Sequence, residues 1–224
     1  MHDRRVARII TPGTLIDENF IDPYANNYIM AIHVSPETDP GVEPTKPHQG
    51  DEDLSLGLSW LDLSTGHFFT QTTKLSSLGA IISRISPREI VLDEDFESQK
   101  DHHLYSILAE DRHLITYAPP GSLLAIEDWI PMLESEIPET TKDSLTPDEI
   151  QSGGLLLGYV RDRLQGMSMK LQPPLRHESM QIMSIDKNSL RALEVKETIR
   201  DGYFKGSLLH AIRRTVTKRA IDLN

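Results

Sequence analysis

Cysteine is absent from the 224-residue sequence, and long apolar runs are absent as well. Without cysteine the chain has no disulfide, no thiolate zinc site and no cysteine nucleophile. The apolar stretches, such as residues 155–157, are far shorter than the roughly 20 residues that a membrane-spanning helix needs. The N-terminus also lacks the apolar core of a secretory signal peptide. We therefore expect an intracellular protein that does not contact a membrane.

Basic side chains are scarce in the first two thirds of the chain. Residues 1–150 hold 27 acidic and 10 basic side chains, a net charge of −17, whereas residues 151–224 hold 7 and 13, a net charge of +6. Binding along a phosphate backbone needs clustered Lys and Arg. The first 150 residues are therefore poor candidates for broad contact with DNA, and the later basic excess is typical of solvated helix faces.

Phosphate-binding and metal-binding signatures are also missing from the sequence. The pattern Gly-x-x-x-x-Gly-Lys-Ser/Thr, whose backbone amides cradle phosphates, does not occur, and neither 153–154 nor 202–206 replaces it. The nine histidines show no spaced cluster of the kind that binds metal ions. We therefore expect no cofactor, no metal and no catalytic residue in this chain.

The hydrophobic pattern predicts an α/β domain. Alternation typical of strands occurs at 27–34, 54–63, 67–73, 89–92 and 113–117, and helical spacing occurs at 75–85 and 96–110. The resulting order, β-β-β-α-β-α-β, predicts a mixed sheet with helices packed on it. This connectivity is that of ribonuclease-H-like folds, although several other α/β folds begin in the same way.

Proline-rich acidic segments divide the chain. Residues 35–53 are predicted to be a long acidic surface loop, and residues 131–146 an acidic linker. A helix is expected over 147–164, with Thr146 as its N-cap and Glu149 at the spacing of a capping box. Further helices are expected over 188–198 and 207–214. An α/β domain is thus predicted to give way to a purely helical segment.

Two short segments have the composition of tight turns. In Thr11-Pro12-Gly13-Thr14, proline fixes one φ angle and glycine allows a positive one. In residues 62–66, the Asp62 or Ser64 side chain is expected to cap the backbone beside Thr65, and Gly66 to take the strained position of a hairpin turn.

These segments resemble the MutS family of DNA mismatch repair proteins, in its bacterial and mitochondrial form. An Arg-x-x-Thr-Pro-Gly-Thr segment, here Arg8 to Thr14, leads into the connector domain of that family. An Asp-x-Ser-Thr-Gly turn, here 62–66, joins two strands of the connector, and Pro87 with Glu89 matches its Pro-x-Glu-Ile segment. Further residues resemble the start of the family's core domain: Asp186, Leu193, Glu194, Gly206, Ser207, Leu208, Leu209, Thr215 and Thr217.

The resemblance implies a domain organisation. Residues 1–8 would be the tail of a linker from a missing mismatch-binding domain, and 9–130 the ribonuclease-H-like connector. Residues 131–146 would be an acidic linker, and 147–224 the truncated start of the all-α core (lever) domain. The proline-rich acidic insert at 35–53 favours a eukaryotic, mitochondrial version of the family.

The resemblance also implies a function and partners. The full-length parent would recognise mismatched double-stranded DNA in an ATP-dependent way, with ATP and Mg²⁺ bound outside this chain. The connector would relay conformational state without chemistry and would contact a MutL-type protein, the rest of the MutS chain and a MutS dimer partner. The Phe-x-Glu motif with which MutS proteins insert a phenylalanine beside a mismatch is absent from this sequence.

Two alternatives stay open. Ribonuclease-H-like nucleases hold two metal ions with carboxylates on early strands, and Asp62, Glu89 and Asp93 would be the candidates here. Alternatively, the sequence stops before a further helix of the core domain, so the chain would be a non-functional truncated product whose residues from 185 onward are frayed.

Overall fold

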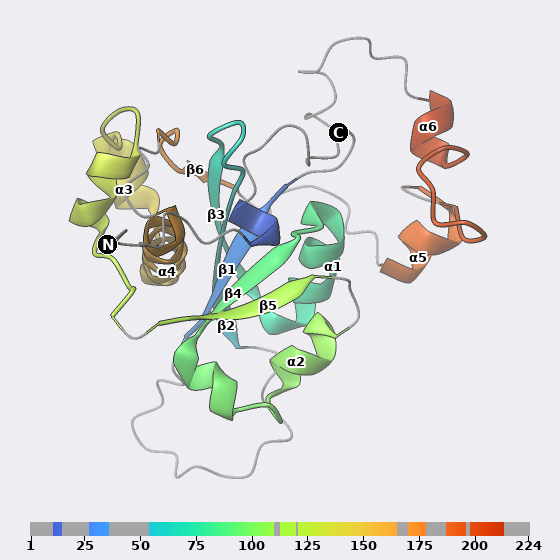
Figure 1. Cartoon of the computed structure of the whole chain (residues 1–224), viewed down its shortest axis with the longest axis horizontal. Helices are drawn as coiled ribbons and strands as arrows, with labels where there is room; N and C mark the ends of the chain where they lie inside the picture. The colour runs from blue at the N-terminus through green and yellow to red at the C-terminus, as the bar shows by residue number, and fades with distance from the viewer. Residues whose placement is uncertain are drawn as a thin grey trace, which may run out of the picture.

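The computed structural model describes residues 11–14, 27–35, 54–109, 113–119, 121–164, 170–177, 187–195 and 198–212. Its centre is a six-stranded mixed sheet with the strand order β5-β4-β1-β2-β3-β6 (Figure 1). The strands are β1 (Ile29–Val34), β2 (Ser55–Leu61), β3 (Phe68–Lys74), β4 (Glu89–Asp93), β5 (Leu114–Ala118) and β6 (Leu175–Arg176). The predicted mixed sheet is therefore confirmed. Most of the predicted loop at 35–53 lies outside the described residues.

The register of the sheet follows the predicted order of strands. β1, β2 and β3 form an antiparallel trio, with Ile29 opposite Leu61 and Leu61 opposite Phe68. β4 lies parallel to β1, and β5 lies parallel to β4. Parallel neighbours need crossover connections, and helices after β3 and β4 provide them. The edge strand β6 pairs in parallel with β3.

Side chains that alternate along the strands build two cores. Ile29 and Ala31 of β1 face a core that α4 (Pro147–Leu164) and η4 (Ile126–Met132) cover. Met30 and Ile32 face the opposite core, which α1 (Leu75–Ile85) and α2 (His103–Leu108) cover. The sheet thus lies between two helical layers (Figure 1), and both of its faces are buried.

Helix α1 has the predicted bounds. Its five buried side chains, Leu75, Leu78, Ile81, Ile82 and Ile85, are those with helical spacing. The helix ends at Ser86, whose φ of 52° is left-handed, and Pro87 follows in a position that cannot continue a helix.

The helix predicted over 96–110 is wrong in its extent. The segment forms a 3-10 helix, η3 (Glu94–Ser98), and then the shorter α2. The Asp93 carboxylate caps η3 by accepting from the Asp95 backbone N–H at 3.1 Å. The His102 ring caps α2 by accepting from the Leu104 N–H at 3.1 Å. These two side-chain caps split the single predicted helix into two shorter ones. Leu104 and Leu108 are nevertheless buried, as the helical spacing predicts.

Helix α4 packs directly on the sheet. A Cβ atom on Gly57 of β2 would lie 1.9 Å from the Asp148 carbonyl oxygen, and one on Gly158 would lie 1.6 Å from the Ser122 carbonyl oxygen. Gly57 of β2 and Gly158 of α4 therefore mark places where the backbones approach closely. Helix α4 shares a core with β1, β2 and β4. Residues 147–164 therefore belong to the same packed unit as the sheet, and the predicted domain boundary before residue 147 is not seen.

Residues 131–146 do not form a separate linker. Met132, Leu133, Ile137 and Leu145 are buried in the same core as α4, and the surface helix α3 (Glu139–Ser144) lies between Ile137 and Leu145 in the sequence. Leu133 also forms a β-bridge with Leu171. The prediction of a separate linker is therefore wrong, because the apolar side chains of this segment pack into the core that contains α4. The acidic residues of the segment remain on the surface.

Two short helices follow, α5 (Lys187–Ala192) and α6 (Leu208–Ile212), on the side of α1 away from the sheet (Figure 1). α5 contacts α1. α5 is shorter than the helix predicted over 188–198, whereas α6 lies within the predicted 207–214, whose last two residues are outside the described part of the chain. Large apolar side chains in this part are exposed, namely Leu193, Ile199, Tyr203, Leu208 and Ile212.

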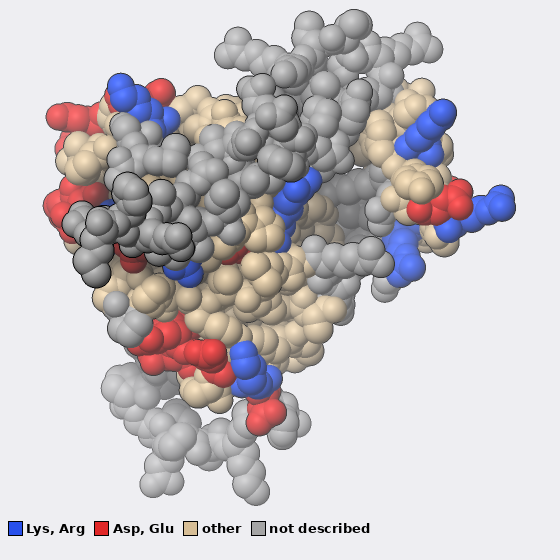
Figure 2. Space-filling model, viewed as in Figure 1, with Lys and Arg blue, Asp and Glu red and all other residues tan. Residues whose placement is uncertain are grey.

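Charge is unevenly spread over the surface. In the view of Figure 2, acidic side chains gather over η3 and over α3, whereas basic side chains are more frequent toward α5 and α6. In the part of the chain that the structure describes, no helix is both long and apolar enough to span a membrane.

Candidate functional site

Glu89 joins three distant parts of the chain. It is the first residue of β4 and is fully buried. Its Oε2 accepts from the backbone N–H of Gly13 at 2.9 Å. Its Oε1 accepts from the Thr116 hydroxyl at 2.9 Å and from the Tyr159 hydroxyl at 2.7 Å. These bonds offset the cost of burying a carboxylate and tie residues 11–14, β5 and α4 together. We call this arrangement the Glu89 hub.

The first contact of the hub is the N-terminal turn, residues 11–14, of which Pro12–Thr14 form the 3-10 helix η1. The Thr14 Oγ1 accepts from the Thr11 backbone N–H at 2.8 Å, and Thr14 is buried. Gly13 does not adopt a positive φ, so that expectation is wrong. A Cβ atom on Gly13 would lie 2.7 Å from the Ile29 Cβ and 3.0 Å from the Glu89 Oε2. Glycine is therefore needed for space, because the hub lies against it.

The α4 contact of the hub is Tyr159, which is fully buried. Burial raises the pKa of Tyr159 above its ordinary value, and the nearby Glu89 carboxylate raises it further, although Thr116 and Arg163 act in the opposite direction. The hydroxyl is therefore protonated at neutral pH and serves as a donor. The Arg163 guanidinium lies 4.5 Å from the centre of the Tyr159 ring. Arg163 thus packs on the Tyr159 ring, and both residues belong to α4.

The Asp62 turn, residues 62–66, is a hairpin turn as predicted. The Asp62 Oδ1 accepts from the Ser64 N–H at 2.8 Å and from the Ser64 hydroxyl at 2.6 Å. The Thr65 Oγ1 accepts from the His67 N–H at 3.4 Å. Gly66 has a φ of 76°, and its carbonyl accepts from the Gln172 N–H at 2.8 Å. The turn thus also anchors the segment that leads to β6.

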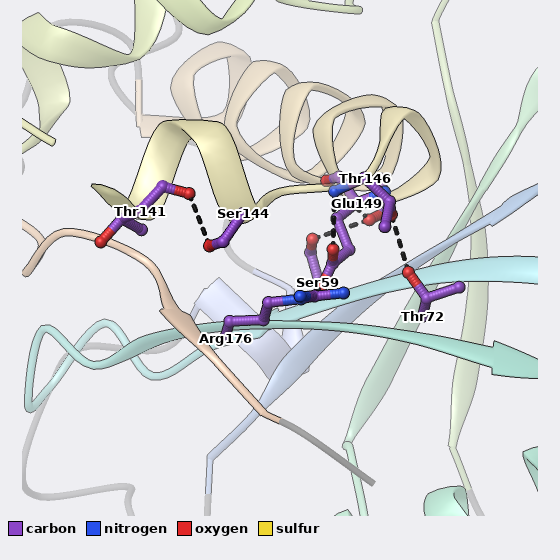
Figure 3. Close-up of polar contacts among 8 residues, drawn as sticks. Ser59, Thr72, Thr141, Ser144, Thr146, Glu149 and Arg176 are labelled. Carbon is purple, nitrogen blue, oxygen red and sulfur yellow. Dashed lines mark hydrogen bonds and ion pairs between the residues drawn. The ribbon is translucent and has the colours of Figure 1, made fainter. Parts of the chain in front are cut away.

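A second buried carboxylate, Glu149, fixes the start of α4 (Figure 3). Its Oε2 accepts from the Thr146 N–H at 2.8 Å, and the Thr146 Oγ1 accepts from the Glu149 N–H at 3.2 Å, so the predicted capping box is confirmed. The Glu149 Oε1 also accepts from the Arg176 Nε of β6 at 3.2 Å. This ion pair is shielded from solvent on the Glu149 side, because the Glu149 side chain is 0% exposed whereas that of Arg176 is 34% exposed.

Hydroxyl groups complete this polar contact between α4 and the sheet. The Thr146 and Thr72 hydroxyls lie 2.7 Å apart, and the Ser59 and Ser152 hydroxyls lie 2.8 Å apart. Figure 3 shows Ser59 and Thr72 on the strands below the helix, and Arg176 approaching from β6. The polar groups satisfy one another, so the cluster positions α4 and leaves no open ligand site among these residues.

The carboxylates considered for a nuclease do not converge. Asp62 and Glu89 lie at the same end of the sheet, because Ile29 is paired with both Leu61 and Glu89. Asp93 lies at the opposite end of β4. Each carboxylate accepts a hydrogen bond from a nearby backbone N–H: Asp62 within its turn, Glu89 in the hub and Asp93 at the start of η3. Within the described ranges, no group of three or more His, Cys, Asp or Glu side chains is placed to hold a metal ion.

Two predicted motif segments near the C-terminus come together. The Leu208 N–H donates to the Glu194 carbonyl at 2.9 Å, and the Leu209 N–H donates to the Val195 carbonyl at 3.0 Å. Ser207 is buried and caps α6, because its Oγ accepts from the His210 N–H at 3.2 Å. Gly206 has a φ of 103°, where glycine is favoured. Leu193 lies beside this contact and is 61% exposed.

Other predicted motif residues lie outside the described residues, namely Arg8, Asp186, Thr215 and Thr217. Pro87 separates α1 from β4. Sequence reasoning missed Thr116, Tyr159 and Arg176. Each is a single polar residue in a strand or helix, and its partner is distant in the chain, so no local pattern indicates its role. Glu149 was found because the capping box has a fixed spacing.

A family model described as "MutS domain II" matches residues 27–172 of the chain. The matched range begins before β1 and extends through α4, so it includes the whole packed unit except for η1 and β6.

Curated relatives match almost the entire chain. The DNA mismatch repair protein MutS of Wolbachia pipientis wMel is 34% identical over 216 residues, which cover 96% of this chain and 23% of that protein. The proteins of the same name from Microcystis aeruginosa and Anaplasma phagocytophilum are 29% and 31% identical, and the matches cover 96% of this chain and 24% of each relative. The chain thus spans about a quarter of the length of the curated relatives it matches.

Proposed function

The chain belongs to the MutS family of DNA mismatch repair proteins, and we propose that it serves as the connector of a longer protein of that family. MutS domain II is a non-catalytic connector domain. In this role the chain makes and breaks no covalent bond, and it transmits a change of position between the modules that it joins.

The Glu89 hub is the observation that carries this proposal. One buried carboxylate holds the N-terminal turn, β5 and α4 at distances of 2.7 to 2.9 Å. A displacement of residues 11–14 must therefore either move α4 or break a charge-assisted hydrogen bond in a buried site. At the other end of α4, Thr146 contacts Thr72 of β3 and Glu149 contacts Arg176 of β6, so the helix moves with the sheet.

The strand order and the two helical layers support a ribonuclease-H-like assignment of the sheet. Three antiparallel strands followed by two parallel ones, with helices on both faces, are the features predicted for that class. Residues 187–212 would be the start of the core domain. Their exposed apolar side chains would be covered by further helices of the parent.

The activities of the parent are part of the same proposal. The parent would recognise mismatched double-stranded DNA, bind ATP and Mg²⁺ outside this chain and act as a dimer that recruits a MutL-type protein. The acidic surface over η3 and α3 is better suited to a protein contact than to a DNA backbone (Figure 2). The Thr-Pro-Gly-Thr form is common to bacterial and mitochondrial members, and the proline-rich acidic insert favours a mitochondrial location, which fractionation of cells that express a tagged parent would test.

The proposal is tested on the purified chain. Biolayer interferometry should detect saturable binding of a MutL-type ATPase region to the immobilised chain. Parallel assays should detect no ATP turnover and no Mg²⁺-dependent cleavage of duplex DNA, with Asp62→Asn as the control for cleavage. ATP turnover by a pure sample would contradict the connector role, as would cleavage that Asp62→Asn abolishes. If the folded chain does not bind the MutL-type region, the proposal that a MutL-type protein is its partner is wrong.

A further inference from the structure

In the part of the chain that the structure describes, the outer edge of β5 has no partner strand. β5 is the last strand in the sheet order, and in the described part of the chain β4 is the strand paired with it. The Leu114 N–H donates to the Arg88 carbonyl at 2.9 Å, toward β4. Because backbone groups of successive strand residues point to opposite edges, the N–H and C=O groups of Ile115 and Tyr117 point outward. These groups can bind an added strand.

The edge is accessible and short. Leu114 is 43% exposed, and Ile115, Thr116 and Tyr117 are half-buried. Pro119 follows the strand and has no N–H to donate, so the edge ends there. In the view of Figure 1, the middle of β5 coincides with a surface that is uncharged in Figure 2. A strand added here would gain a few backbone hydrogen bonds, which suits a short peptide better than a long sheet contact.

Acidic side chains border this edge. η3 contacts β5, and its Glu94, Asp95 and Glu97 are exposed. Among the residues that the structure describes, these three carboxylates form no ion pair. Figure 2 shows this acidic patch with one basic group next to it. Lys100 lies at the same end of β5, where its ammonium is 4.3 Å from the centre of the Tyr117 ring, so the three carboxylates outnumber the one cation there. Cationic side chains at one end of an added strand would therefore meet several carboxylates.

We propose that the outer edge of β5 binds an extended peptide segment that carries Lys or Arg at the end nearest to η3. The occupant is a segment that supplies cations to the η3 patch, and pairing between two copies of this chain is the competing arrangement that the experiment distinguishes. The proposal does not rest on the proposed function, since it requires no DNA, no ATP and no MutL-type protein.

The test uses the full chain and three synthetic peptides. The first peptide is Lys-Lys-Thr-Val-Thr-Val-Thr with blocked ends. The second replaces the two lysines by glutamates, and the third carries N-methyl groups at alternate residues on its bonding edge. We expect the second and third peptides to bind at least about tenfold more weakly than the first in a fluorescence titration. Equal binding of the first and third peptides would overturn the proposal.

Amide hydrogen exchange locates the binding site. With the first peptide at saturation, exchange of the Ile115 and Tyr117 amides should slow by about tenfold or more, while the Leu114 and Thr116 amides should change little. The double variant E94Q/E97Q should weaken binding by about threefold or more, and the matched α3 variant E139Q/D143N should not. Unchanged exchange at 115 and 117, or equal effects of the two variants, would overturn the proposal. Protection of these amides by self-association without peptide would also overturn it.

Discussion

At the scale of single residues, the molecule depends on buried carboxylates that are fully used. Glu89 and Glu149 are both 0% exposed, and each accepts hydrogen bonds from segments far away in the sequence. Burying a carboxylate without hydrogen-bond partners costs free energy. When its oxygens accept hydrogen bonds, the same carboxylate helps to specify a single folded structure. Substitutions at these positions should therefore be judged by the partners that they leave unpaired.

The first prediction concerns Glu89→Ala. The change leaves the Gly13 N–H and the Thr116 and Tyr159 hydroxyls without their buried acceptor. We expect the free energy of unfolding to fall by at least about 3 kcal/mol, since each buried unsatisfied donor costs about 1–3 kcal/mol. Urea denaturation measures the loss. Glu89→Gln keeps one acceptor oxygen and should cost less, and a loss below about 1 kcal/mol for Glu89→Ala would contradict the hub.

The second prediction concerns pH. Burial lowers the pKa of His177 below its ordinary value of 6.5, and the charge of Arg84 lowers it further. The His177 ring therefore binds a proton less readily in the folded state than in the unfolded state. The contribution of neutral His177 to the free energy of unfolding is complete above pH 6.5 and decreases as the pH falls below 6.5. We expect His177→Asn to flatten the decline of the unfolding free energy between pH 6.5 and 5. The exposed His103→Asn should not, and identical slopes for wild type and His177→Asn would refute this assignment.

At the scale of elements, α4 is the helix that determines how the layers fit. Its start is fixed by the capping box and its middle lies against the segment 122–124. The sequence predicts the first feature, because a capping box has a fixed spacing. It does not predict the second, since glycines in a helix are by themselves only a sign of weak helix propensity.

The third prediction concerns Gly158→Ala. Alanine raises helix propensity by about 1 kcal/mol, but its Cβ would lie 1.6 Å from the Ser122 carbonyl oxygen. We expect the clash to dominate and the chain to lose about 1–3 kcal/mol of unfolding free energy in urea. Gln151→Ala, on the exposed side of α4, is the matched control and should be neutral or slightly stabilising. A stabilising Gly158→Ala would mean that α4 does not approach Ser122.

The fourth prediction concerns the cap of α4. Thr146→Ala removes the acceptor for the Glu149 N–H and the contact with the Thr72 hydroxyl. We expect a loss of about 1 kcal/mol, as is usual for an N-cap, with most of it recovered by Thr146→Ser. Thermal unfolding followed by circular dichroism compares the two variants. If serine and alanine destabilise the chain equally, the hydroxyl is not the group that matters.

At the scale of the whole molecule, periodicity in the sequence predicted the sheet but not the contacts that link its layers. The alternation in β2 and the spacing in α1 are local, so they can be read from adjacent residues. The bonds of Glu89 to Gly13 and Tyr159 span 76 and 70 positions and have no local signal. The break between η3 and α2 and the packing of 131–146 were missed because each depends on caps or cores that neighbouring residues do not indicate.

The fifth prediction concerns the helices after residue 186. Leu193, Ile199 and Tyr203 are all more than half exposed, whereas Ile29 to Ala31 of β1 are fully buried. Segments with few buried apolar contacts open locally at low free energy. In the isolated chain, we expect amides of 187–195 and 198–212 to exchange at least about 100-fold faster than those of β1. Comparable protection in the two regions would show that this part is stable without further helices.

In the parent protein, the Glu89 hub is expected to couple the N-terminal turn to α4. The most direct test of this coupling is the rate at which ATP releases the full-length protein from mismatched DNA, measured for Tyr159→Phe, which removes only the donor to Glu89. We expect mismatch affinity to stay within about twofold of wild type while the release rate changes by about tenfold, with Tyr105→Phe as the silent control. An unchanged release rate in a folded Tyr159→Phe variant would contradict this coupling.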